Sequence, residues 1–440
     1  MRTSHWILTA TLLLAVNLFA ADAVKAPEGF TAIFSGTDLT GWWGATTEDP
    51  VKYMTMPPEE FAKKKELSIV DIKKHWRCEN NELVNDGNGL YCTTDKYYGD
   101  IEFVIDYKTV AKADSGIYLR GTPQVQIWDY TKEGGKWGIG ADKGSGGLWN
   151  NPPGTPGKDP AVLADKPFGE WNHFRIVMVG EYVTVWLNEK LVVDHARLAN
   201  YYNKTKPLPR TGPIQLQTHG GEIRWRNIFL REIPPEEANT ILRNGGPDKK
   251  PDESFATIFN GKDFTGWAGP IDNYQVQDGA ILCKPGKGGT IYTSENYKDF
   301  AVKLDIKLPP AGNNGLAIRY PGSGDTAYVG MCELQVLDSE HPSYAKLDPR
   351  QYHGSAYGMI PAARGYLRET GQWNYEEVTV KGSTIRVELN GTRILDGDLS
   401  KVTEYAGNHP HPGKDRTEGG FGFAGHSDPV AFRNIFIKKL

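Results

Sequence analysis

Apolar and polar residues alternate over many short stretches of this chain, a pattern typical of β-strands with one buried face. Residues 101–107 (IEFVIDY) and 301–307 (AVKLDIK) show the alternation clearly. Residues 175–187 and 377–389 each predict a strand, a turn at a glycine and a second strand, and a hairpin turn follows at Asn188-Glu189 or Asn390-Gly391. About ten short strands in each half predict an all-β chain built from two-sheet sandwiches of jelly-roll character.

Helical periodicity is confined to the first half of the chain. Residues 57–76 (PPEEFAKKKELSIVDIKKHW) predict one or two short helices, and the second half has no counterpart. The insert that contains them, residues 46–76, is expected either to cover a site in the first half or to dock the second half.

The two halves are copies of one another. Residues 30–44 (FTAIFSGTDLTGWWG) and 255–269 (FATIFNGKDFTGWAG) share nine of fifteen positions. Residues 169–194 match 371–396 without a gap, sharing Gly, Trp-Asn, Gly, Leu-Asn and the final Asp. Each half closes on a related segment, Trp225-Arg226-Asn227-Ile228-Phe229 or Phe432-Arg433-Asn434-Ile435-Phe436. The sequence therefore predicts two homologous domains, residues 30–232 and 255–440.

The segments outside these domains have different compositions. Residues 233–254 are rich in Pro, Gly and Lys, which predicts a linker. Residues 1–23 begin with Arg2, continue as an apolar run of about 15 residues and end on Ala21-Asp22-Ala23, which predicts a cleaved signal peptide rather than a membrane span. We expect a protein without a membrane span that is periplasmic or secreted.

Composition narrows the function. The 440 residues are 39% hydrophobic and 24% charged, with a net charge of −4, so a basic footprint for nucleic acid is missing. An aromatic content of 11% with 12 Trp suits faces that stack on sugars. The four cysteines, Cys78, Cys92, Cys283 and Cys332, are too few for a disulfide scaffold, and spacing leaves open whether they pair.

Polar residues that recur in both halves at strand positions are candidates for chemistry, because a buried polar group must be satisfied or functional. One pair is Arg120 and Arg319, which follow Ser115-Gly116 and Asn314-Gly315 at a strand end. A structural Arg paired with a carboxylate is the alternative. The other pair is Gln124-x-Gln126 and Glu333-x-Gln335, with Asp129 and Asp338 after them. Period 2 puts 333 and 335 on one face, which is expected to be wet or to bind a ligand.

Histidines and loop aromatics also recur. His219 and His426 each lie seven residues before the closing Arg, as expected for a general base or a metal ligand, with a core histidine as the alternative. Trp149 and Tyr357 lie in loops and are candidates to stack on a sugar, together with the nearby His353. Trp171 and Trp373 open strands and are expected in the core. No phosphate loop, nucleophile elbow or His-Glu-x-x-His motif occurs in the sequence.

Taken in order, these features resemble the 3-keto-disaccharide hydrolase domain family. The resemblance includes the opening Phe-x-Gly and Gly-Trp block, the Gly…Arg strand, the Gln…Asp strand, the Trp-Asn hairpin, the His and the closing Arg-Asn-Ile, and it covers both halves. It implies two concanavalin-like sandwiches, export, and a carbohydrate substrate whose C3 hydroxyl has been oxidised to a ketone. The chain departs from the family pattern at Gln124, where Glu is usual, and at Ala424, where the first half has Gln217.

The resemblance also implies a mechanism. A base removes the C2 proton made acidic by the ketone, the glycosidic oxygen leaves by β-elimination, and water adds back. Side-chain chemistry suggests His219 or His426 as base or enolate ligand, Arg120 or Arg319 as enolate stabiliser, and Glu333 as acid/base of the second domain. The expected substrate- or divalent-cation-binding residues are Gln126, Asp129, Gln335 and Asp338, with Trp149, Gln217, His353 and Tyr357 as further substrate contacts.

Two other classes of protein fit some of these features. A tandem carbohydrate-binding protein without turnover would share the fold and the aromatic residues. A retaining β-glucanase would need two carboxylates about 5 Å apart, and Glu333-x-Gln335-x-x-Asp338 offers only a broken version of that motif.

Overall fold

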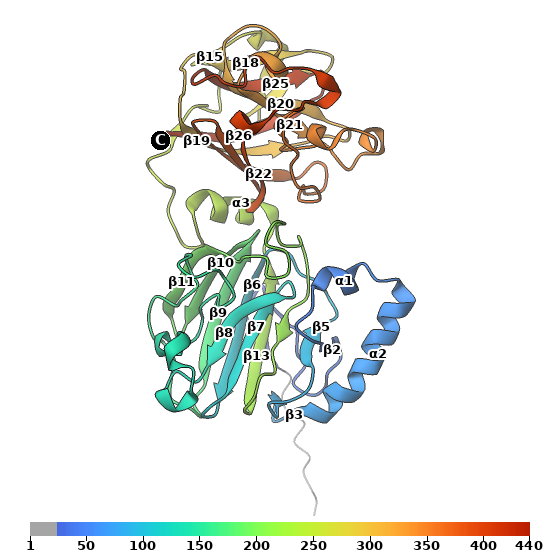
Figure 1. The fold of residues 1–440 in the computed structure, drawn as a ribbon, viewed down its shortest axis with the longest axis vertical. Coiled ribbons are helices and arrows are strands. Elements are labelled where there is room, and N and C mark those ends of the chain that lie inside the picture. The colour runs from blue at the N-terminus through green and yellow to red at the C-terminus, as the bar shows by residue number, and fades with distance from the viewer. Residues whose placement is uncertain (1–23) are drawn as a thin grey trace, which may run out of the picture.

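The computed structural model describes residues 24–440, and the predicted signal peptide of residues 1–23 lies outside them. Figure 1 shows two β-rich bodies stacked along the long axis, with the insert helices on the flank of the first. Each body contains thirteen strands that pair in the same order, so the predicted all-β tandem architecture is confirmed.

The first domain is a sandwich of an eight-stranded and a five-stranded sheet. The larger sheet has the order β11-β10-β9-β6-β13-β4-β3, with β1 beside β13, and the smaller has the order β2-β5-β12-β7-β8. The strands are β1 (Thr31–Ala32), β2 (Trp42–Ala45), β3 (Trp76–Glu79), β4 (Glu82–Asn85), β5 (Tyr91–Thr94), β6 (Ile101–Thr109), β7 (Asp114–Leu119), β8 (Thr122–Trp128), β9 (Asn172–Val179), β10 (Tyr182–Leu187), β11 (Lys190–Arg197), β12 (Gln215–Leu216) and β13 (Ile223–Glu232).

The second domain repeats this arrangement. Its larger sheet runs β16-β17-β26-β19-β22-β23-β24, with β14 beside β26, and its smaller sheet runs β15-β18-β25-β20-β21. The strands are β14 (Ala256–Thr257), β15 (Trp267–Ala268), β16 (Tyr274–Gln277), β17 (Ala280–Cys283), β18 (Gly288–Thr293), β19 (Phe300–Lys307), β20 (Asn313–Tyr320), β21 (Cys332–Leu337), β22 (Trp373–Lys381), β23 (Thr384–Leu389), β24 (Thr392–Asp398), β25 (Gly420–His426) and β26 (Ala431–Lys439).

The alternation along the strands decides what each sheet face carries. In β8, Val125 and Ile127 are fully buried in the core between the two sheets. Leu334 and Val336 of β21 do the same in the second domain. The intervening residues of both strands therefore point to the outer face of the smaller sheet, as period 2 predicts, and that face is where the polar candidates gather.

The closing Arg-Asn-Ile-Phe motif is a β-bulge. The pairing of β13 with β6 shifts register between Arg226 and Phe229, and Asn227 has a φ of 50°. The Asn227 side chain donates to Asp106 at 2.8 Å, and Asn434 donates to Asp305 at 2.7 Å in the matching place. Asn tolerates the left-handed conformation and its amide stabilises the bulge.

The prediction that Trp171 and Trp373 belong to the core is wrong. Both are half-buried on the outside of the larger sheet. The Arg226 guanidinium lies 4.1 Å from the Trp171 ring and that of Arg433 lies 4.0 Å from the Trp373 ring. Cation–π contacts with the bulge, rather than core packing, explain why Trp and Arg recur together.

The insert forms helices α1 (Pro50–Met54) and α2 (Pro58–His75). Helix α2 fills the predicted range 57–76 as one helix, and α1 lies before that range. Helix α2 packs along the edge strand β2 of its own domain, where Ser68 Oγ accepts from the Gly44 N–H at 2.9 Å. Further along the helix, Asp71 accepts from the Leu90 N–H at 2.6 Å. The insert thus covers an otherwise unpaired sheet edge.

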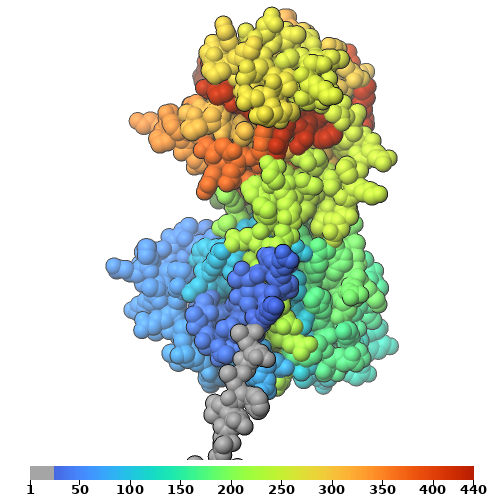
Figure 2. All heavy atoms as spheres, turned by 180° about the vertical axis from the view of Figure 1, so that it is seen from behind, coloured from blue at the N-terminus to red at the C-terminus, as the bar shows by residue number. Residues whose placement is uncertain are grey.

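Helices also occur outside the first domain, contrary to the expectation. Residues 233–254 contain α3 (Pro235–Asn244), and the second domain contains α4 (Thr326–Val329). Ile241 and Leu242 of α3 pack with Val179 of the first domain and Tyr375 of the second. Arg243 also donates to Asp305 at 2.7 Å. The space-filling view shows this segment bridging the waist between the two bodies (Figure 2).

Cys78, Cys92, Cys283 and Cys332 are all free thiols. Among residues 24–440, no helix combines the length and the apolar character that a membrane crossing requires.

Candidate active site

A pocket of about 340 Å³ lies on the outer face of the smaller sheet in the first domain. Its floor comes from β7, β8 and the residues after β12, and it includes the predicted Gln126, Gln217, His219 and Trp149. Strand alternation places Gln126 on this face, because its neighbours Val125 and Ile127 belong to the core, while Gln217 and His219 follow β12 and Trp149 reaches the pocket from a loop. The structure thus brings four of the predicted residues together.

His219 is held by the carboxylate of Asp114, which was not among the predicted residues. The imidazole Nδ1 of His219 lies 2.7 Å from the Asp114 carboxylate, while 57% of the His219 side chain is exposed. Lys136 binds the same carboxylate, and Gln126 donates to its other oxygen at 2.7 Å. Asp114 therefore contacts three side chains of the site. Its bond to Nδ1 of His219 leaves Nε2 of the imidazole available to a ligand.

Electrostatics favour a neutral His219. Burial and the charge of Lys136 lower the pKa of His219, and burial also lowers the pKa of Lys136. A neutral imidazole beside a carboxylate is able to accept a proton at neutral pH.

The floor of the pocket offers unused hydrogen-bonding groups. The side-chain carbonyl oxygens of Gln124 and Gln217 are buried and have no partner within residues 24–440. Tyr118, whose hydroxyl contacts Thr47 at 3.0 Å, has a pKa raised by burial and so keeps its proton. Two acceptors and a phenol donor on one polar floor suit the hydroxyls of a sugar.

Aromatic rings form one wall of the pocket. Trp128 and Trp149 pack edge to face with ring centroids 4.8 Å apart. Lys158 lies 3.3 Å above the Trp149 ring. Tyr91 and Tyr201 complete the rim. The wall presents flat apolar surface next to polar groups, as sugar-binding sites do.

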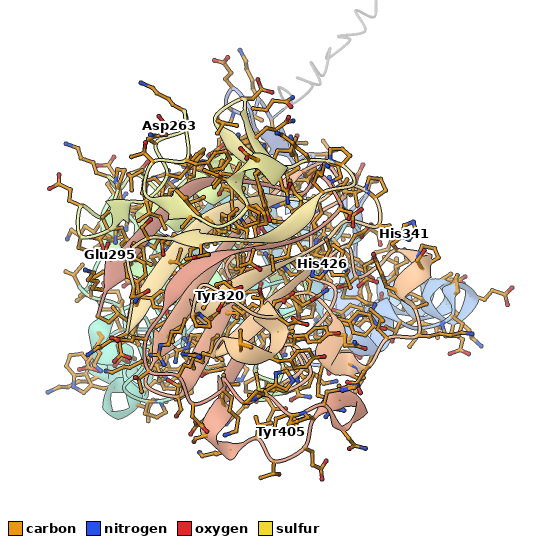
Figure 3. The ribbon with its side chains drawn as sticks, turned by 90° about the horizontal axis from the view of Figure 1, so that it is seen from above. Asp263, Glu295, Tyr320, His341, Tyr405 and His426 are labelled. Atoms are coloured by element: carbon orange, nitrogen blue, oxygen red, sulfur yellow. The ribbon has the colours of Figure 1, made fainter. Side chains whose placement is uncertain are left out.

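The matching face of the second domain carries a different histidine–carboxylate pair, His426 and Glu333. The His426 imidazole lies 3.7 Å from the Glu333 carboxylate, and it is labelled in the view from above in Figure 3. Burial raises the pKa of Glu333, and the carboxylate raises the pKa of His426. Gln335 donates to Asn313 at 3.0 Å, as Gln126 does to Asp114. Each domain therefore has a histidine beside one carboxylate, on β7 in the first domain and on β21 in the second.

Smaller side chains and an added helix change the second face. By strand register, Tyr91, Tyr118 and Gln217 of the first domain correspond to Thr290, Ala317 and Ala424. Helix α4 lies between β20 and β21, where the first domain has a tight turn, and its Thr326 hydroxyl bonds that of Thr290 at 2.5 Å. Tyr357 lies at the edge of this face, where its hydroxyl accepts from Gln351 at 2.9 Å.

The structure does not bring the two arginines to either face. Arg120 follows β7 at the end opposite Asp114, roughly 20 Å along the strand. Its guanidinium is buried, bonded to the Gly99 carbonyl and to Asp100 at 3.1 Å. Arg319 bonds Asp299 at 3.0 Å and the Lys298 carbonyl at 2.8 Å in the same way. Both have φ near 50°. These contacts correspond to the structural alternative, an Arg paired with a carboxylate.

Three other predicted residues are also engaged in structural contacts. Asp129 accepts from the Lys112 N–H at 2.7 Å, and Asp338 accepts from the Ala311 N–H at 2.9 Å. Both donors have positive φ, so the carboxylates fix the turn before β7 or β20. His353 is buried and bonded to Glu376 at 2.9 Å. Within residues 24–440, no group of three or more His, Cys, Asp or Glu side chains is arranged to hold a metal ion.

The repeat contains a weak indication of Asp114 and Asn313, which were not predicted as site residues. Asp114 and Asn313 stand next to the aligned Ser115-Gly116 and Asn314-Gly315, and both are polar. Comparison of the two halves at this position shows a carboxylate in the first domain and an amide in the second, the reverse of Gln124 and Glu333. Lys136 lies in a loop without a counterpart in the aligned motifs.

Fold and site together define a tandem β-sandwich protein with a polar, aromatic-walled pocket. The model of the 3-keto-alpha-glucoside-1,2-lyase-like domain matches residues 29–231 and again residues 254–438. The chain belongs to this carbohydrate-acting family and contains two copies of its domain.

Individual relatives match about one domain of the chain. A 3-keto-disaccharide hydrolase of Bacteroides thetaiotaomicron is 26% identical over 229 residues, covering 43% of this chain and 79% of the relative. A solved structure from Parabacteroides distasonis, named as a candidate glycosyl hydrolase, is 27% identical with a TM-score of 0.38 and covers 42% of this chain and 94% of its own. The carbohydrate-binding module CBM66 of Bacillus subtilis is 14% identical with a TM-score of 0.27, covering 40% and 98%.

Proposed function

We propose that this protein cleaves the glycosidic bond of 3-keto-glycosides, and that the first domain carries out the reaction. The observation that carries the proposal is the His219–Asp114 contact of 2.7 Å inside a pocket with a polar floor and an aromatic wall. The family membership of both domains supports the substrate class.

The proposed reaction starts with a proton transfer. Nε2 of neutral His219 takes the C2 proton of the sugar, and the C–H electrons form the C2–C3 double bond of an enolate. Asp114 holds Nδ1–H and stabilises the imidazolium that results, while Lys136 lies within the same cluster and favours negative charge nearby.

Elimination and hydration complete the reaction. The enolate electrons reform the C3 ketone, a C1–C2 double bond forms, and the bond from C1 to the glycosidic oxygen breaks. That oxygen takes a proton, for which the neutral Tyr118 hydroxyl and the imidazolium are the donors on this face. Water then adds to C1 and a proton returns to C2, so the sum is hydrolysis without an oxocarbenium ion.

The first domain is preferred because it combines groups that the second does not. Lys136, Tyr118, Gln217 and two tryptophans surround His219. In the second domain the corresponding positions carry Ala317 and Ala424, and α4 is bonded to β18 beside them.

The test compares two substrates that differ only in oxidation at C3. The protein is incubated with a glucoside and with its 3-keto derivative, with and without chelator, and products are identified by NMR and mass spectrometry. Release of the alcohol from the keto sugar alone supports the proposal. Cleavage of the unoxidised glucoside would point to an ordinary glycosidase, and binding without cleavage of either sugar would point to a tandem carbohydrate-binding protein.

We also propose that residues 1–23 direct export. Fractionation of cells producing the full chain is expected to recover a protein shortened by this segment outside the cytoplasm. Recovery of the full-length chain in the cytoplasmic fraction would contradict the proposal.

A further inference from the structure

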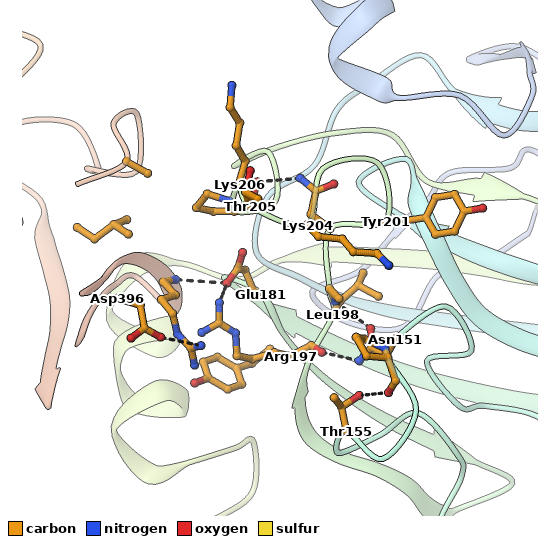
Figure 4. Close-up of a pocket in the computed structure, with 18 of the residues that line it drawn as sticks. Asn151, Thr155, Glu181, Arg197, Leu198, Tyr201, Lys204, Thr205, Lys206 and Asp396 are labelled. Atoms are coloured by element: carbon orange, nitrogen blue, oxygen red, sulfur yellow. Dashed lines mark hydrogen bonds and ion pairs between the residues drawn. The ribbon is translucent and has the colours of Figure 1, made fainter. Parts of the chain in front are cut away.

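A second and larger cavity lies between the two domains. It has a volume of about 870 Å³ and takes its walls from β10, β11 and the loop after β11 in the first domain, and from the segment 361–363 and β24 in the second (Figure 4). Ligand sites in proteins commonly have volumes of 300–1,000 Å³ and often lie at domain boundaries.

This interdomain cavity adjoins the pocket of His219. Asn150 and Tyr201 line both spaces. Tyr201 is 44% exposed, and in Figure 4 its ring points away from the other drawn residues, toward the strands of the first domain. A ligand that extends from His219 past Tyr201 therefore enters the interdomain cavity.

The charges of the cavity are unbalanced. Its carboxylates are already paired, Glu181 with Arg197 and Asp396 with Arg393 at 3.4 Å. Lys204 and Lys206 line the cavity and are exposed, and neither has an ion-pair partner within residues 24–440. In Figure 4 the Lys204 side chain runs toward the side where Tyr201 lies. Unpaired cations beside the pocket favour an anionic group on the ligand.

The cavity also offers rigid apolar surface. Pro152 and Pro156 from the first domain and Pro361 from the second are exposed along it. Proline rings are apolar and already ordered, so contact with an aromatic ring costs little conformational entropy.

We infer that the interdomain cavity binds the leaving group of the substrate, and that it suits an aromatic aglycone bearing a carboxylate. The inference rests on the proposed function, since it assigns the sugar to the His219 pocket. The second domain then completes the substrate site from across the interface.

Three substrates of increasing reach test the inference: the methyl, phenyl and 4-carboxyphenyl 3-keto-glucosides. The wild type is expected to prefer the carboxyphenyl substrate. The double variant Lys204→Gln/Lys206→Gln is expected to lower kcat/KM for that substrate about tenfold, as loss of a charged hydrogen bond does. It should leave the methyl substrate within about twofold of wild type.

A variant of the second domain provides the matched test of the opposite wall. Pro361→Trp fills the cavity from an exposed position, so the fold should be retained, and it is expected to lower kcat/KM for both aryl substrates but not for the methyl one. Unchanged aryl rates in both variants, or an equal loss for all three substrates, would overturn the inference. A wild type that prefers phenyl to carboxyphenyl would overturn the assignment of the anionic group.

Binding separates this inference from the proposed reaction. Titration calorimetry with the unoxidised 4-carboxyphenyl and methyl glucosides needs no turnover. Tighter binding of the carboxyphenyl glucoside that is lost in Lys204→Gln/Lys206→Gln supports the cavity even if no keto-glycoside is cleaved. Equal binding of both glucosides, together with turnover of the methyl keto-glucoside, supports the reaction and overturns the cavity assignment.

Discussion

One carboxylate accompanies the histidine in each domain, but it comes from a different strand. Asp114 on β7 pairs with His219, and Glu333 on β21 pairs with His426. At the position where the first domain has Asp114, the second has the amide Asn313. At the position where the second domain has Glu333, the first has the amide Gln124. The exchange keeps a single buried negative charge beside each histidine, as the cost of burying two like charges requires.

This exchange supplies a conservative test of Asp114. Asp114→Asn places in the first domain the residue that the second domain already carries, so folding should be retained while the imidazolium loses its carboxylate. We expect kcat on a 3-keto-glycoside to fall by about 10² or more, measured by initial rates with circular dichroism as the check on folding. The control Asn313→Asp should leave the rate near wild type; a rate unaffected by Asp114→Asn would exclude Asp114 from the mechanism.

We expect Lys136 to set the acid limit of the proposed reaction through its effect on the pKa of His219. Burial and the Lys136 charge lower the pKa of His219, so the base stays neutral to lower pH than a free histidine. In Lys136→Gln the repelling charge is gone and Asp114 is less neutralised, so the pKa of His219 rises. The acid limb of kcat/KM should move to higher pH, whereas Lys132→Gln, an exposed change nearby, should leave the limb in place. A limb that stays in place or moves to lower pH in Lys136→Gln would contradict this assignment.

The sequence predicted that the histidines and glutamines of the candidate site lie on one face, but it placed the two arginines there wrongly. Period 2 and the repeat were enough for Gln126, Gln335 and both histidines, since these depend on strand face alone. Arg120 lies on an aligned strand too, but whether it reaches the pocket depends on which end of β7 it occupies and on the buried carbonyls that bind it. Those contacts come from segments distant in sequence, which no local pattern reports.

At the scale of strands, the glycines of β7 and β20 make room for the polar residue of the neighbouring strand. A Cβ at Gly116 would lie 2.8 Å from the Gln124 side chain, and one at Gly315 would lie 2.1 Å from the Glu333 carboxylate. This close approach accounts for Ser-Gly and Asn-Gly at the same place in both domains.

Gly315→Ala therefore introduces a clash. We expect a loss of about 1–3 kcal/mol in the free energy of unfolding, measured by urea denaturation. The double variant Gly315→Ala/Glu333→Ala removes the opposing side chain and should recover most of the loss. Equal destabilisation of the single and double variants would show that Glu333 is not the group that requires glycine.

The sequence predicted the long helix α2 from its periodicity but did not predict the shorter helix α3. Helix α2 has eighteen residues and its pattern is readable. Helix α3 has ten residues between Pro234 and Gly245, so composition indicated a linker. Its buried Ala238, Ile241 and Leu242 pack against residues of both domains, which are distant in sequence. Tertiary packing rather than helix propensity therefore stabilises α3.

At the scale of the whole molecule, α3 joins the domains through an apolar cluster. Leu242 is 4% exposed and packs among residues of β9, α3 and β22. Leu242→Ala should cost about 2 kcal/mol or more of stability and lower the midpoint of the first calorimetric transition. Leu67→Ala, at a position 65% exposed on α2, is the control. An unchanged midpoint in Leu242→Ala would mean that the domains unfold independently of this contact.

In the proposed reaction, His219 removes the C2 proton of a 3-keto-glycoside. Turnover in D₂O followed by NMR reports it directly, because a proton that leaves C2 is replaced by deuterium from solvent. Wild-type protein and His426→Gln are expected to release the alcohol and to place deuterium at C2 of the keto sugar, and His219→Gln is expected to do neither. Turnover without deuterium at C2, or deuterium incorporation that survives in His219→Gln, would exclude His219 as the base.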